Sequence, residues 1–330
     1  MVRLRRVRLD HPGWTRRRAG RGFVYLDADG RRIAEPEHLE RLETLAIPPA
    51  WRDVWICPWP NGHIQAAGLD DAQRRQYLYH LQWQARRSRL KHDHVLDVAR
   101  RLPAARRRVR ADLALDGMPR DKSLALAFRL LDRAYLRVGT EGYTRRHGSF
   151  GLATLRRDHV RVLADDDGSP GAVHLLFPAK SGQVRDTVVD DETVAGLVRT
   201  LLRRRDPSPE LLAWRDDDGW HDVTSADVGA YVRDRLGDAT PKDFRTWHAT
   251  VLAARGLADA GPAPRSERAR RRVVAAVVKD VAEELGNTPA VARASYVDPR
   301  VVDLWERGAT ITPTRSQQVA ERRTLDLLTS

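Results

Sequence analysis

The sequence predicts an α+β protein with two domains: a small β-rich N-terminal domain, residues 1–88, and a larger, mainly α-helical domain, residues 89–330. Three observations lead to this prediction. The chain of 330 residues is long enough for two domains of unequal size, and 42% of its residues are hydrophobic, which suffices for a packed core. Short alternating runs bounded by turn residues fill the first part of the chain. Long patterns with helical spacing follow from about residue 90.

The expected strands come first. Residues 22–26 (GFVYL) run into the turn sequence DADG. The runs at 54–58 and 63–67 flank the sequence WPNG, and Asn-Gly is a strong hairpin signal. Residues 76–79 alternate between two faces and predict one further short strand.

Helices are expected to dominate the second part. A pattern of leucines follows Asp121 as far as Tyr135, and Gly139 is expected to stop this helix. A helix over 272–285 is expected to end at Gly286. Thr288 then caps a new helix, with Pro289 at its favoured first position.

One β region interrupts the helices. Strands are expected near 158–164, 172–178 and 183–189, separated by turns at 165–168 and 179–182.

Two further segments are expected to lie at the surface. The stretch from Pro264 to residue 272 is expected to be an exposed basic loop. The tail after Pro313 is expected to be a short peripheral helix.

The charge of the chain favours a polyanionic partner. The net charge is +13, which points to nucleic acid first and an anionic membrane surface second, with a generally basic surface as the remaining explanation. Of the 58 cationic residues only five are lysines, and arginine cannot give up a proton near neutral pH. A lysine retained in such a chain is therefore a candidate for proton transfer.

The sequence argues against disulfides, metal or cofactor sites, membrane spans and secretion. Cys57 is the only cysteine, so neither an internal disulfide nor a multi-thiolate metal site can form. The sequence contains no nucleotide-binding loop, metal-binding histidine motif or acidic metal cluster, so neither cofactor nor metal is expected. No apolar run reaches the length of a membrane span, and the basic start lacks the apolar core of a secretory signal. The expected compartment is the cytoplasm.

Five polar residues at helix ends and turns are candidates for chemistry. They are Arg137, Lys180, Arg245, Asn287 and Tyr296. Each also has a structural explanation: a helix C-terminal cation, a solvated turn residue, a surface ion pair, a helix stop and a half-buried ring, respectively. Their order along the chain, rather than any single residue, indicates a function.

Short segments along nearly the whole chain occur in the order found in one family. They are PPAW at 48–51, VWIC at 54–57, PNGHIQA at 60–66, RQYLYH at 75–80, LRVG at 136–139, FGLATL at 150–155, FPAK at 177–180, KDFRTW at 242–247, LGNTPA at 285–290 and SY at 295–296. With these segments the chain resembles the bacterial branch of the poxvirus-like type IB DNA topoisomerases. The resemblance implies that the larger domain has the tyrosine recombinase/type IB topoisomerase fold. It also implies that both domains form a clamp round DNA.

The resemblance assigns a role to each of the five candidate residues. Tyr296 matches the nucleophile, Arg137 and Arg245 match the two phosphate-binding arginines, and Lys180 matches the hairpin lysine that acts as general acid. Asn287 departs from the pattern, since many members have a histidine there that donates to a non-bridging phosphate oxygen. An amide can donate the same hydrogen bond, but it brings no charge.

The implied activity is relaxation of supercoiled DNA by transient cleavage of one strand, rotation and religation. A tyrosine needs help to act as a nucleophile at neutral pH, and two guanidiniums would favour its phenolate. Lysine can protonate the departing 5′ oxygen. Because a 3′-phosphotyrosyl bond replaces one phosphodiester by another, resealing is expected to need neither ATP nor metal.

The resemblance also suggests DNA contacts and an assembly state. It implies that Gln76, Tyr77 and Tyr79 face the major groove, where glutamine can read a base edge, and that Tyr143 and Lys242 bind DNA. The alternative for the two strand tyrosines is packing on a core. The expected partner is supercoiled duplex DNA, bound by a monomer associated with the nucleoid, without a nucleotide or a membrane.

Two alternatives remain at this stage. A tyrosine recombinase has the same catalytic fold, but recombinases usually place histidine three residues before the second arginine, where this chain has Lys242. A non-catalytic protein that binds duplex DNA would have lost a catalytic residue, and only Asn287 supports that reading. A covalent protein–DNA adduct would separate the two classes.

Overall fold

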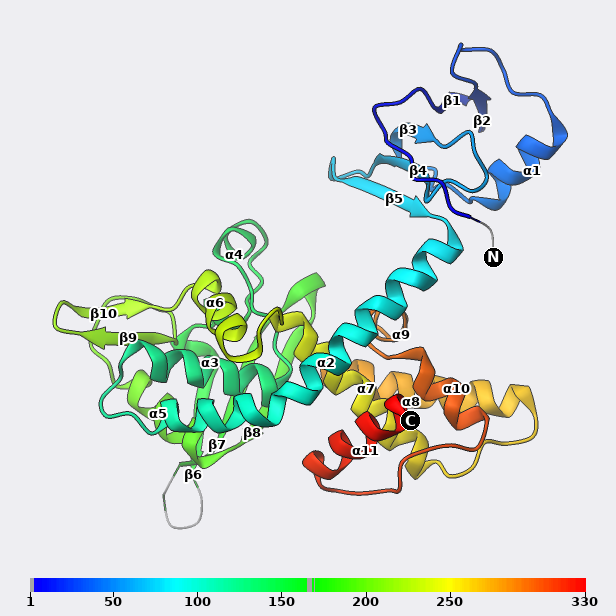
Figure 1. Ribbon diagram of the computed structural model, residues 1–330. Coiled ribbons are helices and arrows are strands. Elements are labelled where there is room, and N and C mark those ends of the chain that lie inside the picture. The colour runs from blue at the N-terminus through cyan, green and yellow to red at the C-terminus, as the bar shows by residue number, and fades with distance from the viewer. Residues whose placement is uncertain (1–2, 165–167, 169) are drawn as a thin grey trace. The chain divides into compact units, whose positions relative to one another are not determined.

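A computed structural model of the chain describes residues 3–164, 168 and 170–330 (Figure 1). It consists of two compact units, Met1–Lys91 and His92–Ser330, each with its own hydrophobic core. The predicted boundary after residue 88 falls inside α2 (Leu81–Leu113), a single long helix. Of the turn expected at 165–168, only Gly168 lies within the described residues.

The described part of the first unit consists of an antiparallel five-stranded sheet, one helix and the first turns of α2. The strands in spatial order are β2 (Gly22–Leu26), β1 (Trp14–Ala19), β3 (Arg52–Ile56), β4 (Ile64–Leu69) and β5 (Arg75–Tyr79). Helix α1 (Pro36–Thr44) contributes Leu42 to a core that it shares with Trp14, Val54 and Ile56 from the sheet. The four strands predicted here are therefore confirmed.

Strand β1 and the connection at Asn-Gly differ from the prediction. Strand β1 has the sequence WTRRRA, which lacks the alternation of apolar and polar residues that identifies a strand, and it was not predicted. The Asn-Gly sequence does not form a two-residue hairpin turn. Strands β3 and β4 do pair, but the connection runs from Cys57 to His63, where Gly62 bridges Arg5 near the start of the chain.

The second unit is mainly helical (Figure 1). After α2 its helices are α3 (Arg120–Ala134), α4 (Glu141–His147), α5 (Glu192–Leu202), α6 (Ser225–Leu236), α7 (Pro241–Asp259), α8 (Glu267–Leu285), α9 (Pro289–Ser295), α10 (Pro299–Glu306) and α11 (Gln317–Thr329). Its two antiparallel sheets are β6 (Val160–Ala164), β7 (Pro170–Pro178) and β8 (Val184–Asp190), and the hairpin of β9 (Ala213–Asp216) and β10 (Gly219–Asp222). The mainly helical character and the three-stranded β region agree with the prediction, whereas the β9–β10 hairpin was not predicted.

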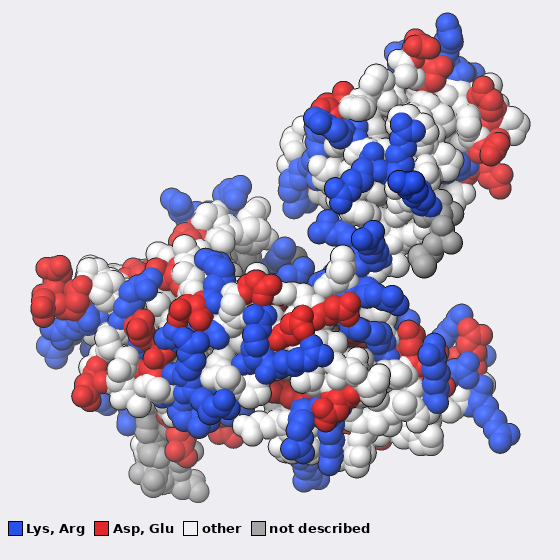
Figure 2. All heavy atoms as spheres, viewed as in Figure 1, with Lys and Arg blue, Asp and Glu red and all other residues white. Residues whose placement is uncertain are grey.

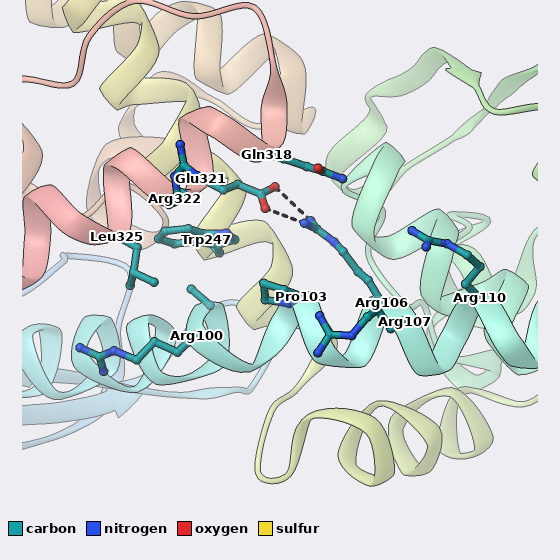
Figure 3. A pocket seen from close by; sticks show the side chains of 11 residues that line it. Arg100, Pro103, Arg106, Arg107, Arg110, Trp247, Gln318, Glu321, Arg322 and Leu325 are labelled. Carbon is teal, nitrogen blue, oxygen red and sulfur yellow. Dashed lines mark hydrogen bonds and ion pairs between the residues drawn. The ribbon is translucent and has the colours of Figure 1, made fainter.

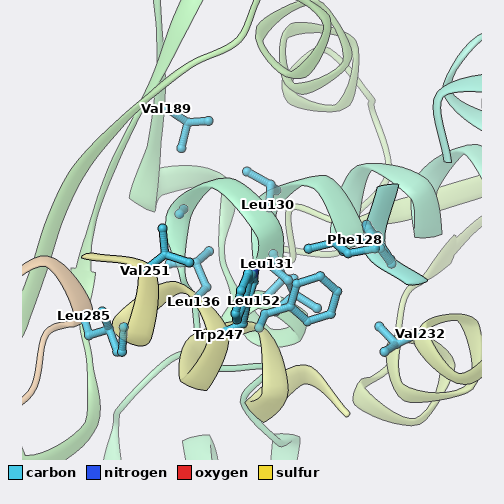
Figure 4. Close-up of a cluster of buried hydrophobic side chains, with 14 of the residues drawn as sticks. Phe128, Leu130, Leu131, Leu136, Leu152, Val189, Val232, Trp247, Val251 and Leu285 are labelled. Carbon is cyan, nitrogen blue, oxygen red and sulfur yellow. The ribbon is translucent and has the colours of Figure 1, made fainter. Parts of the chain in front are cut away.

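Helix α3 lies in the centre of the core of the second unit. Its sequence alternates leucine with alanine and phenylalanine, so apolar side chains point in several directions, and Leu124, Phe128 and Leu131 are completely buried. Figure 4 shows Phe128 beside residues of α7 and neighbouring helices. Its ring meets the ring of Phe244 edge to face, with centroids 5.0 Å apart. The C-terminal end of α3 is thereby held firmly, and the candidate site begins there.

Two helix limits differ from those expected. Helix α3 ends at Ala134 rather than near Gly139, because Tyr135 adopts a left-handed conformation with φ 55°. Helix α8 begins at Glu267, capped by the Ser266 side chain, so most of the predicted basic loop at 264–272 is helical. The end of α8 at Gly286 and the cap of α9 by Thr288, followed by Pro289, are as predicted.

The C-terminal helix is less peripheral than expected. Within α11 the side chains of Ala320, Glu321 and Thr324 are buried. The buried Glu321 is notable because a carboxylate is almost never fully buried without a partner. Within the described ranges, no helix combines the length and the apolar character required to cross a lipid bilayer.

Candidate active site

Three arginines from different parts of the chain meet at the C-terminal end of α8. Gly286 closes this helix with φ +59°, a conformation suited to glycine. Arg185, Arg245 and Arg137 donate to the carbonyl groups of residues 284, 285 and 286 in that order, at 2.6, 2.8 and 3.3 Å. A helix C-terminus carries partial negative charge, so it offsets part of the repulsion between the three guanidiniums.

The end of α3 supplies further acceptors to the same arginines. Because Tyr135 turns the chain through a left-handed conformation, two carbonyl groups point toward the guanidiniums. The carbonyl of Ala134 accepts from Arg185 at 3.1 Å, and that of Tyr135 accepts from Arg245. Arg137 then follows two residues after the turn. The unusual backbone at Tyr135 therefore arranges both the acceptors and one of the arginines.

The backbone around Arg137 is fixed by a very close approach of two glycines. A Cβ atom on Gly151 would lie 2.5 Å from the Cα of Gly139, and one on Gly139 would lie 2.8 Å from the Cα of Gly151. This proximity lets Leu152 donate to the carbonyl of Arg137 at 2.9 Å, with a second such bond to the next residue. Only glycine allows the two segments to come so close.

Tyr296 lies directly after α9 and beside Arg245. Its residue surface is 9% exposed, and the guanidinium carbon of Arg245 is 5.1 Å from its ring centroid. Burial alone would raise the pKa of Tyr296. The charge and hydrogen bonding of Arg245, with the charges of Arg137 and Lys242, outweigh burial, so the pKa of Tyr296 lies below its ordinary value.

Arg245 is itself perturbed by this environment. Only 3% of its surface is exposed, and burial, followed by the charge of Arg137, lowers its pKa to about 10. Its Nε is buried and has no hydrogen-bond partner among the described residues. A buried donor of this kind, next to a tyrosine oxygen, is suited to an anionic ligand.

Asn287 immediately follows the end of α8, and Arg137 determines the orientation of its side chain. Arg137 donates to Oδ1 of Asn287, so the amide nitrogen Nδ2 points the other way. Nδ2 is buried and has no partner within the described part of the chain. The site therefore holds a second unused donor close to the arginines.

The lysines lie at the edge of this group. Lys180 is exposed at the start of the turn between β7 and β8, and its Nζ is 5.8 Å from the ring centroid of Tyr143 on α4. The same turn borders the small cavity that Arg137 and Arg245 line. Among the described residues, no hydrogen bond joins Lys180 to Tyr296 or to the arginines. Lys242 is exposed one turn before Arg245 on α7.

The structure thus brings Tyr296, Arg137, Arg245 and Asn287 together, and places Lys180 nearby. Sequence reasoning missed Arg185. In β8 the inward-facing positions are Arg185, Thr187 and Val189, whereas Val184 and Val188 point outward. An arginine in register with buried residues of a strand is the signal that could have identified it.

The other DNA-binding candidates lie in the first unit. The rings of Tyr77 and Tyr79 stack on one another with centroids 5.7 Å apart, and Tyr77 is 39% exposed on the edge strand β5. Gln76 alternates to the opposite face and donates to Asp70 at 2.8 Å. The structure therefore brings together the two tyrosines but not Gln76. Figure 2 shows basic side chains gathered on the visible face of this unit.

Comparison with known proteins gives a consistent result for both units. Residues 22–70 match the family described as the N-terminal domain of bacterial DNA topoisomerase IB, and residues 80–312 match the catalytic core of eukaryotic DNA topoisomerase I. The chain is 29% identical to DNA topoisomerase 1B of Acanthamoeba polyphaga mimivirus over 304 residues, which cover 89% of this chain and 88% of that protein.

A second relative matches a shorter region. It is the mitochondrial DNA topoisomerase I of Rattus norvegicus, 27% identical over 162 residues, which are 47% of this chain and 26% of the relative. These matches confirm the resemblance found in the sequence. Because the catalytic-core family covers well over half of the chain, the protein belongs to the DNA topoisomerase I family and is a type IB DNA topoisomerase.

Proposed function

We propose that Tyr296 is the nucleophile of this topoisomerase, and that Arg137, Arg245, Asn287 and Lys180 act on the scissile phosphate. The observation that carries the proposal is the contact of Tyr296 with the buried Arg245, which lowers the pKa of the phenol. A lowered pKa raises the fraction of phenolate near neutral pH, and the phenolate is the stronger nucleophile.

In the proposed cleavage step the Tyr296 oxygen attacks the phosphorus. A bond from the phenol oxygen to phosphorus forms, the bond from phosphorus to the 5′ oxygen breaks, and the phenolic proton goes to solvent. Arg137 and Arg245 bind the non-bridging oxygens, on which charge grows in the transition state. Asn287 donates its free Nδ2 to one of these oxygens. The broken strand rotates, and the reverse attack by the 5′ hydroxyl restores the DNA.

Lys180 is proposed as the general acid that protonates the departing 5′ oxygen. The lysine lies in the turn between β7 and β8 beside Tyr143, and no hydrogen bond among the described residues joins it to Tyr296. Catalytic hydrogen bonds often tighten only when substrate binds, so this separation is compatible with the role. A small change in the hairpin would let bound DNA draw the ammonium group away from the Tyr143 ring.

The first unit is proposed to complete a clamp round the duplex, with the second unit having the tyrosine recombinase/type IB topoisomerase fold. The net charge of +13 and the stacked, half-exposed tyrosines of β5 support a DNA-facing role for the first unit. Tyr77 and Tyr79 are the proposed contacts there, and Tyr143 and Lys242 those near the active site. Gln76 would first have to leave Asp70 before it could read a base.

Because one chain supplies the whole residue set, we propose that the enzyme acts as a monomer. We also propose that it acts in the cytoplasm, in association with the nucleoid, and without a nucleotide or a metal ion. A transesterification conserves the energy of the phosphodiester, so no step of the proposed cycle needs ATP.

The experiment is relaxation of negatively supercoiled plasmid in EDTA without ATP, with wild type beside Tyr296→Phe. The proposal predicts that the wild type relaxes the plasmid and that the variant, although it binds DNA normally, does not. Relaxation by both proteins, after purification has removed contaminating enzymes, would mean that Tyr296 is not the nucleophile. A requirement for ATP or metal would contradict the proposed chemistry.

A further inference from the structure

We propose that a buried polar cluster of Arg106, Asp132, His248 and Glu321 positions Arg245 for catalysis, and that helix α11 is thereby a working part of the active site. This inference rests on the proposed roles of Arg245 and Tyr296. The four cluster residues are positioning residues, because they act through Arg245 and do not touch the scissile phosphate.

The guanidinium of Arg106 lies between two buried carboxylates. From α2 it donates to both oxygens of Asp132 on α3, at 2.7 and 2.8 Å, and to both oxygens of Glu321 on α11, at 2.6 and 3.0 Å. The side chains of Asp132 and Glu321 are 5% and 9% exposed. Bidentate arginine–carboxylate pairs are the strongest and most directional ion pairs in proteins.

His248 on α7 and Gln317 on α11 complete the cluster. Nε2 of His248 lies 3.0 Å from Asp132, and Nδ1 lies 3.4 Å from the Gln317 amide nitrogen, which also donates to Glu321 at 3.1 Å. These contacts fit the tautomer in which Nε2 carries the proton and Nδ1 accepts. Four helices, α2, α3, α7 and α11, are thus tied together by hydrogen bonds at one point.

Two of these helices also hold the active-site arginine. Asp132 is three residues before Tyr135 on α3, and His248 is three residues after Arg245 on α7. The ring of His248 packs against that of Tyr135 with centroids 4.7 Å apart. Helices α3 and α7 are therefore joined twice, once through Asp132 and His248 and once through the carbonyl of Tyr135 and Arg245. A shift in the contact between Asp132 and His248 therefore moves the Tyr135 carbonyl group, which accepts from Arg245.

Arg106 and Glu321 join α2 to α11 by a direct ion pair. Figure 3 shows the two side chains joined beside a cavity of about 370 Å³, which side chains of α2 and α11 line together with Trp247. Loss of the Glu321 charge would remove this ion pair and weaken the directional link between the C-terminal helix and the cluster.

Electrostatics favour the charged state of the cluster. Burial opposes ionisation of Asp132, but hydrogen bonding to His248 and the charge of Arg106 outweigh it, so the pKa of Asp132 lies well below its usual range. Burial likewise opposes the charge of Arg106, and the two carboxylates overcome it, so its pKa is raised. In such a set, removing one charge leaves the others uncompensated, and the group rearranges.

The test is single-turnover cleavage of a duplex by Glu321→Gln, which keeps the shape of the side chain and removes its charge. We expect cleavage to slow by about tenfold, as a small displacement of a catalytic group does, with DNA affinity unchanged. Because a displaced Arg245 lowers the pKa of Tyr296 less, the rise of the cleavage rate with pH should move to higher pH. Asp326→Asn, an exposed carboxylate on the same helix, should behave as wild type in all three measurements.

Two controls separate positioning from loss of stability. Leu325→Ala loosens the same helix without touching the cluster, so at a similar loss of melting temperature it should keep the wild-type pH profile. In an Arg245→Lys background the effect of Glu321→Gln should largely vanish, since both changes act on one contact. Equal slowing in both backgrounds, or an altered pH profile in Leu325→Ala, would overturn the inference.

Failure of the positioning role and failure of the proposed function give different results with Glu321→Gln and Tyr296→Phe. If Tyr296→Phe still relaxes plasmid, the assignment of the nucleophile is wrong whatever Glu321→Gln does. If Tyr296→Phe is inactive and Glu321→Gln cleaves at the wild-type rate with the wild-type pH profile, only the positioning role is refuted.

Discussion

Arg245 carries its charge at a position where very little of its surface reaches solvent. Its hydrogen bonds go to backbone carbonyl groups of Tyr135 and Leu285, which hold the guanidinium without neutralising it. The full positive charge therefore acts on Tyr296 and on whatever anion enters the site. This arrangement explains how the phenol of Tyr296 can be both buried and easier to ionise than in water.

The two perturbed residues predict a bell-shaped pH dependence. Cleavage should rise with pH until Tyr296 is ionised, because the phenolate attacks, and kcat/KM should fall as Arg245 loses its proton at about pH 10. Arg245→Gln removes the largest charge that lowers the Tyr296 pKa. In that variant the rising limb should move to higher pH. Single-turnover rates from about pH 6 to about pH 11 measure both limbs, and an unshifted rising limb in Arg245→Gln would contradict the account.

Asn287 should contribute a hydrogen bond and not a charge. Removing its donor in Asn287→Ala should slow cleavage by about 100-fold, the usual effect of losing one donor to a transition-state oxygen. Affinity for DNA should change little, because a single neutral donor adds little to the attraction of the basic surface. Cleavage kinetics on one duplex, with binding measured in parallel, provide the comparison. A wild-type rate would show that the free Nδ2 does not reach the phosphate.

At the residue scale the sequence identified the members of the site that stand in recognisable motifs. Tyr296, Arg137, Arg245 and Asn287 were predicted in this way, and the structure brings them together. Arg185 was missed because its role depends on the pleat of β8, which is known only after the register is set. The ion pairs of Arg106 with Asp132 and Glu321 were missed for a similar reason, since they join helices far apart in the chain.

At the scale of the elements, the site is assembled from helix ends. The C-terminal carbonyl groups of α8 bind three arginines, and the left-handed turn after α3 presents two more acceptors to them. The segment after α3 is held by backbone hydrogen bonds from residues 152 and 153. The position of Arg137 therefore depends on the close contact of Gly139 with Gly151 as much as on its own side chain.

Gly151→Ala tests this dependence. Its φ of −145° is open to any residue, so the obstacle is the clash of the new methyl group with the backbone of Gly139 and with the carbonyl oxygen of Arg137. We expect a loss of about 2 kcal/mol in the free energy of unfolding, as for other overpacked sites, and slower cleavage because Arg137 moves. Gly142→Ala has no neighbour within 4 Å and is the matched control. Denaturant unfolding and cleavage rates measure the two effects, and equal behaviour of both variants would refute the explanation.

The ends of helices were predictable where capping residues next to them in the sequence determine them. Gly286, Thr288 and Pro289 marked the end of α8 and the start of α9, since a left-handed glycine and a capping threonine are local signals. The end of α3 was wrong because burial of the helix, and the acceptors it offers to two arginines, stabilise a left-handed tyrosine that no propensity predicts. The Arg-rich start of α8 was mistaken for a loop because its charges hide the helical pattern.

At the scale of the whole molecule, both units carry features that suit DNA. The overall charge makes association with a polyanion favourable, and the first unit exposes a stacked tyrosine pair on an edge strand. The sequence predicted the order of a β-rich unit and a helical unit because hydrophobic periodicity differs so clearly between them. Strand β1 was not predicted, because Arg17 and Arg18 are exposed and the half-buried Arg16 donates to backbone carbonyl groups instead of adding an apolar side chain to the core.

Tyr77→Ala combined with Tyr79→Ala tests the contribution of the first unit. The two rings touch one another more than the core, so the fold should be intact while DNA cleavage weakens by about tenfold or more, in line with the loss of two aromatic contacts. Circular dichroism and thermal unfolding check the fold, and cleavage at low enzyme concentration checks the function. A double variant that cleaves at the wild-type rate would remove the tyrosines from the DNA interface.

The central claim, that Tyr296 is joined to DNA during the reaction, can be measured directly. The enzyme would be trapped on a duplex whose cleaved end diffuses away, digested with trypsin, and analysed by mass spectrometry. The account predicts a 3′-linked nucleotide on the peptide ASYVDPR, residues 294–300, at Tyr296, and no adduct with Tyr296→Phe. A nucleotide on any other residue, or an adduct that still forms with Tyr296→Phe, would contradict it.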